Sequence, residues 1–318
     1  MTEPRRHIAG QVAMTSRRCS ERRYFLRPDK FINHVMLYEV GKASERHGQN
    51  VYGAVAMSNH VHIVIGDTTG DRSDFMRDTM SGIARSRNDD LGRDEHFWSS
   101  GSYNDTVLLD DDAIERKLLY VWLNPVRAGV VDRAEDWPGF MILPKHWGKE
   151  ITVKKPPRFY GRESPEEVTF IPKPPPGYGD MPLEDVREHF EKLLRKEENK
   201  ILAMRVANNQ SCSGAKSAEE LDPFSSPRTK KSKRRTNPRF ATKNAELMAS
   251  AQDIRRGFLD DYETQRQRWV ADQKNIVFPC GTIQLKRCAP IKCREVRDDE
   301  PGIFDLSWTP PADKKTAA

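Results

Sequence analysis

The sequence lacks the paired cysteines and the long apolar runs that are typical of secreted and membrane proteins. Its five cysteines are odd in number and form no CxxC pair, as expected for a protein of a reducing compartment. No apolar run approaches the length of a membrane span, and the first ten residues, MTEPRRHIAG, lack the apolar stretch of a signal peptide. We therefore expect a cytoplasmic protein without membrane contact.

Hydrophobic residues are also scarce, at 36% of the chain, whereas 31% of residues are charged and the mean hydropathy is −0.77. A chain of 318 residues with this composition is expected to hold a compact domain together with solvated or flexible stretches. The formal charge of +6 and the pI near 9.0 favour a polyanionic partner, because Lys and Arg clusters release counterions from phosphates. Charge alone does not identify that partner.

The cysteines offer one candidate zinc site, the stretch CAPIKC at 288–293. A structural zinc site needs four ligands, and neither a histidine nor a second cysteine pair lies near this stretch in the sequence. We therefore expect no zinc there.

Strand-like and helix-like patterns alternate through the first third of the chain. We expect strands at 7–16, 50–58, 60–67 and 105–110, and helices at 29–48 and about 71–88. Asp29 is the expected N-cap of the first helix and Gly48 its C-terminal stop. The order βαββαβ predicts an α+β fold, a ferredoxin-like two-layer sandwich.

A further helix is expected at about 113–126. Asp110, Asp111 and Asp112 supply its cap and an acidic first turn. Pro125 is expected to end or kink it.

The rest of the chain is proline-rich and then strongly charged. We expect an extended connector at 146–183, which contains PPP at 174–176, and a charged, basic and partly flexible extension at 184–318. Within the extension we expect an amphipathic helix after the connector, another helix at about 247–272 and a strand-like segment at 276–287. The folded domain is then 1–145.

Two histidines stand in a segment that otherwise reads as a buried strand, AMSNHVHIVI at 56–65. Alternate side chains of a strand share a face, so His60 and His62 lie together on the face opposite Val61 and Ile63. That spacing suits two nitrogen ligands of one divalent metal. Hydrogen-bonded surface histidines or a structural zinc are the alternatives.

A second pair stands in the stretch LLYVWLNPV, where Tyr120 and Asn124 are four residues apart and so lie on one helical face. Tyr120 offers a hydroxyl nucleophile, and Asn124 an oxygen ligand beside it. Alone, each residue also fits a structural role: Tyr120 as a half-buried packing residue, and Asn124 as a cap before Pro125.

Taken together, four stretches resemble the REP-associated branch of the single-tyrosine HUH transposases. They are RRCSERRYFLRPDKFIN, AMSNHVHIVIGD, LLYVWLNPVRAGVV and DWPG, in the family's order within roughly residues 8 to 140. NPRF and VFPCGT resemble the C-terminal extension of longer members. The resemblance implies that 1–145 is the catalytic domain.

Residue by residue, the resemblance makes His60 and His62 the metal-binding pair, Tyr120 the nucleophile and Asn124 the third metal ligand. Better-known relatives use glutamine at the third position, so the shorter Asn124 requires a helix closer to the strand. The implied activity is a metal-dependent single-stranded DNA endonuclease and strand-transferase that acts beside hairpins of the REP type through a 5′-phosphotyrosine intermediate. The implied cofactor is Mg²⁺ or Mn²⁺, and the protein would be associated with the nucleoid, with a homodimer as one arrangement.

Basic residues supply the expected DNA contacts. The candidates are Arg17, Arg18, Arg22, Arg23, Lys230, Lys231, Lys233, Arg234 and Arg235. Tyr24 or Trp98 could stack an unpaired base. Surface charge and core packing are the alternative roles.

Two other functions fit parts of the sequence. One is a domesticated protein that binds DNA hairpins without cleaving them. The other is an RNA-binding protein with a structural zinc, which would keep stoichiometric zinc through dialysis. The first predicts hairpin binding without a covalent adduct, although nothing in the sequence disables the site.

Overall fold

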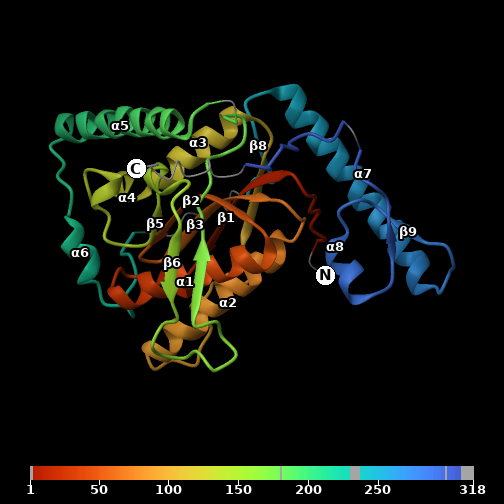
Figure 1. The fold of residues 1–318 in the computed structure, drawn as a ribbon, viewed down its shortest axis with the longest axis horizontal. Helices are drawn as coiled ribbons and strands as arrows, with labels where there is room; N and C mark the ends of the chain where they lie inside the picture. The colour runs from red at the N-terminus through yellow and green to blue at the C-terminus, as the bar shows by residue number, and fades with distance from the viewer. Residues whose placement is uncertain (1–2, 180, 230–236, 298, 309–318) are drawn as a thin grey trace, which may run out of the picture.

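The computed structural model describes residues 3–179, 181–229, 237–297 and 299–308. At its centre is a six-stranded sheet in the order β5-β2-β3-β1-β4-β8 (Figure 1). The four long strands are β1 (Gln11–Arg18), β2 (Asn50–Met57), β3 (His60–Asp67) and β4 (Asn104–Leu108). Neighbours among these four are antiparallel. The predicted α+β class is confirmed.

Helices α1 (Lys30–His47) and α2 (Arg72–Asp90) cover one face of the sheet (Figure 1). Val61, Ile63 and Ile65 of β3 are buried in the core beneath these helices. Fully burying aliphatic side chains of this size contributes about 1.5–3 kcal/mol each. This burial fixes which way β3 faces, because a shift of one residue would turn every side chain over.

The ends of α1 follow from its local sequence, as predicted. Asp29 has an extended backbone, and its Oδ1 accepts a hydrogen bond from the backbone N–H of Ile32 at 2.8 Å. Gly48 ends the helix with a φ of +64°, a left-handed conformation that glycine adopts without strain.

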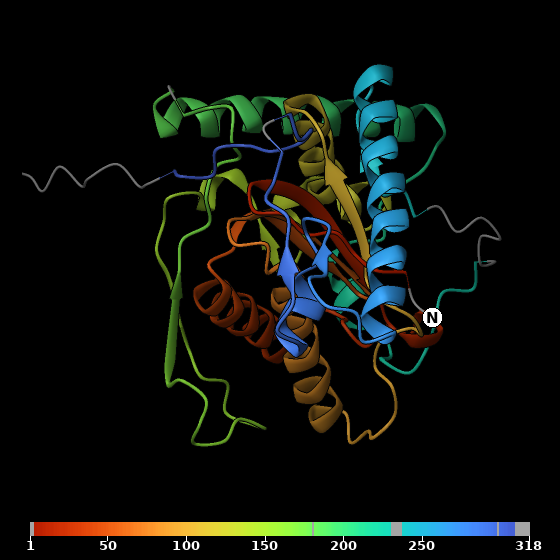
Figure 2. The ribbon, with the colours of Figure 1, turned by 90° about the vertical axis from the view of Figure 1, so that its right-hand side faces the viewer.

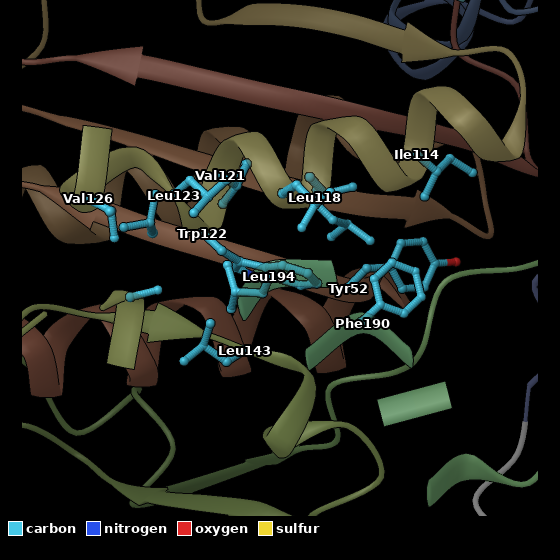
Figure 3. Close-up of a cluster of buried hydrophobic side chains, with 14 of the residues drawn as sticks. Tyr52, Ile114, Leu118, Val121, Trp122, Leu123, Val126, Leu143, Phe190 and Leu194 are labelled. Carbon is cyan, nitrogen blue, oxygen red and sulfur yellow. The ribbon is translucent and has the colours of Figure 1, made fainter. Parts of the chain in front are cut away.

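The opposite face of the sheet is covered by α3 (Asp111–Trp122), α4 (Asn124–Arg127) and α5 (Leu183–Ala207). Figure 3 shows side chains of α3 and α5 meeting above the sheet. Trp122 of α3 and Phe190 of α5 pack edge to face, with ring centroids 6.0 Å apart. This second core holds α3 against β2 and β3.

Helix α3 begins after its predicted cap, Asp110, but ends four residues before the predicted end at 126. Asp110 accepts a hydrogen bond from the backbone N–H of Ala113 at 2.7 Å. The helix ends at Trp122, and the single turn α4, which has Pro125 in its first positions, starts at Asn124. Pro125 therefore interrupts the helix, as predicted.

The proline-rich segment is more ordered than the extended connector predicted for it. Two antiparallel strands, β6 (Ile151–Lys154) and β7 (Glu167–Phe170), form a hairpin beside α1 (Figure 2). Its Val153 and Val168 bury Tyr38 of α1. The hairpin was missed because its strands are only four residues long and their buried side chains pack against α1, far away in sequence.

Short strands complete the sheet at both ends. β5 (Met141–Ile142) pairs antiparallel with β2, and β8 (Phe240–Ala241) pairs parallel with β4. Helix α7 (Ala245–Val270) follows β8 and matches the predicted helix within two residues. The last third of the chain thus contributes directly to the central sheet.

The strand-like segment predicted at 276–287 is only partly a strand. β9 (Val277–Phe278) pairs in parallel with β10 (Lys292–Cys293), but α8 (Ile283–Cys288) begins in the second half of the segment. The remaining short elements are η1 (Ser20–Arg22), η2 (Ala134–Asp136), η3 (Pro144–His146) and α6 (Ala215–Glu219). The predicted domain limits at 145 and 183 stay a prediction.

Candidate active site

The two histidines lie side by side at the start of β3. Their ring centroids are 4.9 Å apart and their planes are nearly perpendicular. His62 is buried, and His60 is partly exposed. Both lie on the face opposite Val61 and Ile63, as strand alternation requires.

Tyr120 of α3 reaches the same place. Its ring centroid lies 5.4 Å from that of His62, with the planes at 81°. Its neighbours Val121 and Trp122 are fully buried, whereas 36% of Tyr120 is exposed. The hydroxyl-bearing residue therefore stands at the edge of the core, beside the histidines.

Close packing of α3 on β2 makes this approach feasible. A Cβ atom on Gly53 would lie 2.7 Å from Leu118 Cδ2 and 2.9 Å from Trp122 Nε1. That indole nitrogen also donates a hydrogen bond to the carbonyl of Ile142 at 2.7 Å. Glycine at position 53 thus lets α3 sit close to the sheet.

Asn124, the first residue of α4, lies close enough to His60 for its side chain to raise the pKa of that imidazole. The N-cap of α4 is Leu123, and no side chain caps this turn. Asn124 therefore faces His60 rather than serving as a helix cap, and its role as a metal ligand stays a prediction.

Both imidazoles are held neutral at pH 7. The pKa of His60 is lowered from 6.5 to about 4, chiefly by burial and also by nearby Arg18, whereas the Asn124 side chain opposes the shift. Burial also lowers the pKa of His62, with further contributions from His60, Arg18 and Lys117. Neutral imidazoles retain the lone pairs that metal ligation requires.

The side chains of the site can be compared with the ligand set that a divalent ion needs. The buried Nδ1 of His62 has no hydrogen-bond partner, so this ring carries an unsatisfied polar atom. Two neutral nitrogens and one amide oxygen suit Mg²⁺ or Mn²⁺ with open positions for other oxygens. Among the described residues, no group of three or more His, Cys, Asp and Glu side chains could hold a metal.

Three positive charges surround the histidine and tyrosine rings. Arg18 of β1 is exposed and stands directly opposite His60 in the pairing of the adjacent strands β1 and β3. Lys117 Nζ and Arg127 Cζ lie 5.6 Å and 5.7 Å from the ring centroid of Tyr120. Sequence reasoning included Arg18 but missed Lys117 and Arg127. Their helical spacing from Tyr120, three residues before and seven after, could have identified them.

Among the described residues, the remaining basic candidates make contacts with other parts of the protein. Arg17 donates a hydrogen bond to the carbonyl of Gly101 at 3.2 Å, and its guanidinium lies 6.0 Å from the ring of Trp98. Lys230, Lys231, Lys233, Arg234 and Arg235 lie outside the described residues.

Arg22 and Arg23 bind a later segment of the chain, 221–229. Arg22 donates to the carbonyl and hydroxyl of Thr229 at 2.6 Å and 2.8 Å. Arg23 donates to the carbonyl of Phe224 at 3.0 Å and pairs with Glu21 at 2.7 Å. These two arginines are therefore engaged within the protein.

The two aromatic candidates for base stacking are partly packed. Trp98 donates its indole N–H to the carbonyl of Met80 at 2.8 Å and packs against Phe97. Tyr24 is partly exposed, and burial raises the pKa of its phenol. Stacking of a base on either ring stays a prediction.

The described helices are all too short or too polar to cross a bilayer. The five cysteines all have free thiols. The stretch at 288–293 therefore forms no disulfide.

No protein-family model matches the chain, and no curated protein does. Among solved structures, it is similar to a REP-associated tyrosine transposase bound to a REP hairpin. The identity is 18% and the TM-score 0.38, over 46% of this chain and 85% of that one. A similarity this distant does not establish a family for the chain.

Proposed function

We propose that the protein is a metal-dependent single-stranded DNA endonuclease and strand-transferase with Tyr120 as its nucleophile. One observation carries this proposal: the Tyr120 ring lies 5.4 Å from that of His62, which lies 4.9 Å from that of His60. A tyrosine at the edge of a core, beside two neutral imidazoles and an amide, combines a nucleophile with a metal-ligand set.

His60, His62 and Asn124 would hold Mg²⁺ or Mn²⁺. When bound, the ion would neutralise phosphate charge and orient the phosphorus toward the hydroxyl. Arg18, Lys117 and Arg127 would add positive charge where a phosphodiester must approach Tyr120.

The reaction would conserve the energy of the phosphodiester. Tyr120 Oη forms a bond to phosphorus and loses its proton, while the bond from phosphorus to the 3′ oxygen breaks and that oxygen gains a proton. The products are a 5′-phosphotyrosyl link and a free 3′-hydroxyl. The same or another 3′-hydroxyl can reverse the step and rejoin DNA without an outside energy source.

The arrangement of the core supports the ferredoxin-like topology predicted from the sequence. The strand order β2-β3-β1-β4, with α1 and α2 on one face, is the order that such a βαββαβ fold requires. In this arrangement the histidines stand on a central strand, which is a rigid platform for a site.

The test uses single strands that carry hairpins and are labelled at the 3′ end, incubated with the full chain and Mn²⁺ and resolved on a denaturing gel. We expect a protein-linked DNA band with the wild type and none with Tyr120→Phe, which removes one oxygen and little packing. Tyr262→Phe on α7 is the matched control and should form the adduct normally. An adduct at wild-type level in Tyr120→Phe would contradict the nucleophile assignment. Hairpin binding without any adduct would favour the non-cleaving alternative.

A further inference from the structure

Asn59, in the turn between β2 and β3, makes hydrogen bonds through both the nitrogen and the oxygen of its side-chain amide. Its Nδ2 donates to the backbone carbonyl of Arg22 at 3.0 Å. Its Oδ1 lies 2.8 Å from Nδ1 of His60. The backbone carbonyl of Asn59 also accepts a hydrogen bond from Cys19 at 2.8 Å.

These partners decide which way the amide faces. A backbone carbonyl can only accept, so the atom of Asn59 facing Arg22 must be the NH₂ group. The oxygen is then the atom that faces His60. An amide oxygen can likewise only accept, so Nδ1 of His60 must carry a proton. In the neutral ring, the lone pair is left on Nε2.

We propose that Asn59 is a positioning residue that fixes His60 in the Nδ1–H tautomer and leaves Nε2 as its donor nitrogen. The metal-binding consequence rests on the proposed function, whereas the tautomer itself does not. Partners of this kind orient imidazole ligands in metal sites and raise their basicity.

The arginine-rich turn supports this arrangement. Glu21 and Arg22 have left-handed backbones, with φ of +52° and +62°, and so present the Arg22 carbonyl to Asn59. The turn is tied to the hairpin again where Leu26 donates to the carbonyl of Ser58 at 2.9 Å. Arg22 thus contributes through its main chain, while its side chain binds Thr229.

The alternative is that Asn59 is only a turn residue, as asparagine often is. A turn role predicts that substitution changes stability and leaves the His60 proton where it was. The two roles therefore differ in a property that can be measured without metal or DNA.

The experiment records long-range proton–nitrogen correlations of ¹⁵N-histidine in metal-free protein, with the His60 signals assigned by their loss in His60→Phe. We expect Nδ1–H at His60 in the wild type and a shift toward Nε2–H in Asn59→Ala. Asn59→Asp keeps an acceptor and should keep Nδ1–H. Asn33→Ala also removes an amide that donates to a backbone carbonyl, at 2.7 Å from Pro138, and is the matched control.

Manganese binding, followed by electron paramagnetic resonance, gives the second measurement. We expect Asn59→Ala to bind Mn²⁺ about 10–100-fold more weakly, the usual effect of losing such a partner, and Asn59→Asp to retain most of the affinity. An Nε2–H signal for His60 in the wild type, or an unchanged signal in Asn59→Ala, would overturn the proposal. A wild type that shows Nδ1–H but binds no Mn²⁺ would instead contradict the metal site of the proposed function.

Discussion

At the scale of single residues, His60 and His62 are close enough to serve one ion together, with ring centroids 4.9 Å apart. We predict that His60→Ala, His62→Ala and the double variant all lose nearly the same fraction of cleavage rate, because one ion needs both nitrogens. Single-turnover cleavage in Mn²⁺ checks this. His189→Ala, at a half-exposed position on α5, is the control. Independent, multiplying losses would show that the two rings do not share a metal.

Asn124 requires a pair of substitutions, because a ligand and a structural residue both fit its position. Asn124→Asp keeps an oxygen and adds charge, so we predict partly retained cleavage with a changed preference between Mg²⁺ and Mn²⁺. Asn124→Ala should cleave very poorly although it folds. Thermal unfolding measured beside cleavage separates the two roles. If Asn124→Ala is less stable but cleaves normally at a permissive temperature, the third ligand must lie elsewhere.

The sequence was informative about these residues because their spacing is local. Strand alternation places His60 with His62, and helical spacing places Tyr120 near Asn124. Neither rule predicts that the histidine pair lies next to Tyr120 and Asn124 in the fold. In the sequence analysis only the family resemblance joined them, and it gave no reason to include Asn59. Lys117 and Arg127 were missed because helical spacing was applied only to Tyr120 and Asn124, and not to the cations before and after them.

At the scale of elements, the distance between α3 and the sheet is set in part by Gly53. An added Cβ would lie within 3 Å of both Leu118 Cδ2 and Trp122 Nε1, and the indole is already hydrogen-bonded to Ile142. We predict that Gly53→Ala costs about 1–3 kcal/mol of unfolding free energy. It should also lower adduct formation, because α3 carries Tyr120.

Urea denaturation and the adduct assay check this prediction, with Gly257→Ala as the control. Gly257 lies inside α7, is exposed, and has no atom within 4 Å of an added Cβ. Alanine should stabilise that helix by about 0.5–1 kcal/mol. Equal effects at the two positions would mean that the packing at Gly53 does not hold α3 in place.

Helix ends were the most predictable feature of the fold. Asp29 and Asp110 cap helices by accepting hydrogen bonds from residues three positions later, and Gly48 ends a helix through its own left-handed backbone, so these signals are local in the sequence. The β6–β7 hairpin and β8 are different, because their partners, α1 and β4, are far away in sequence. The interval 276–287 contains part of a helix where a strand was expected. Its proline and glycine divide it into stretches too short to show either helical or strand periodicity clearly.

At the scale of the whole molecule, the N-terminal segment is tied to the C-terminal region around His7. The backbone N–H of His7 donates to the carbonyl of Gly281 at 3.2 Å, and neither ring nitrogen has a hydrogen-bond partner. Burial, followed by the charge of Arg72, lowers the pKa of His7 from 6.5 to about 3, against the opposing effect of Asp105.

Because the folded pKa is the lower one, the unfolded chain binds this proton first as the pH falls. The stability is fully present above pH 6.5 and is lost between pH 6.5 and about 3. We predict that His7→Phe, which keeps a ring but cannot titrate, loses about 2 kcal/mol less than the wild type between pH 7 and 4.5. Urea unfolding at both pH values measures this difference. Parallel pH profiles would show that His7 is accessible to protons in the folded state.

The sheet ends in two-residue strands, β5 on one side and β8 on the other. An unpaired strand edge is a template for association with another chain, and short terminal strands limit that hazard. β8 comes from the charged extension and pairs with β4, which belongs to the predicted catalytic domain. Removing the chain from Phe240 onward would therefore expose the β4 edge and favour aggregation. Weak DNA binding by such a shortened protein would then be explained by aggregation as well as by the loss of its basic residues.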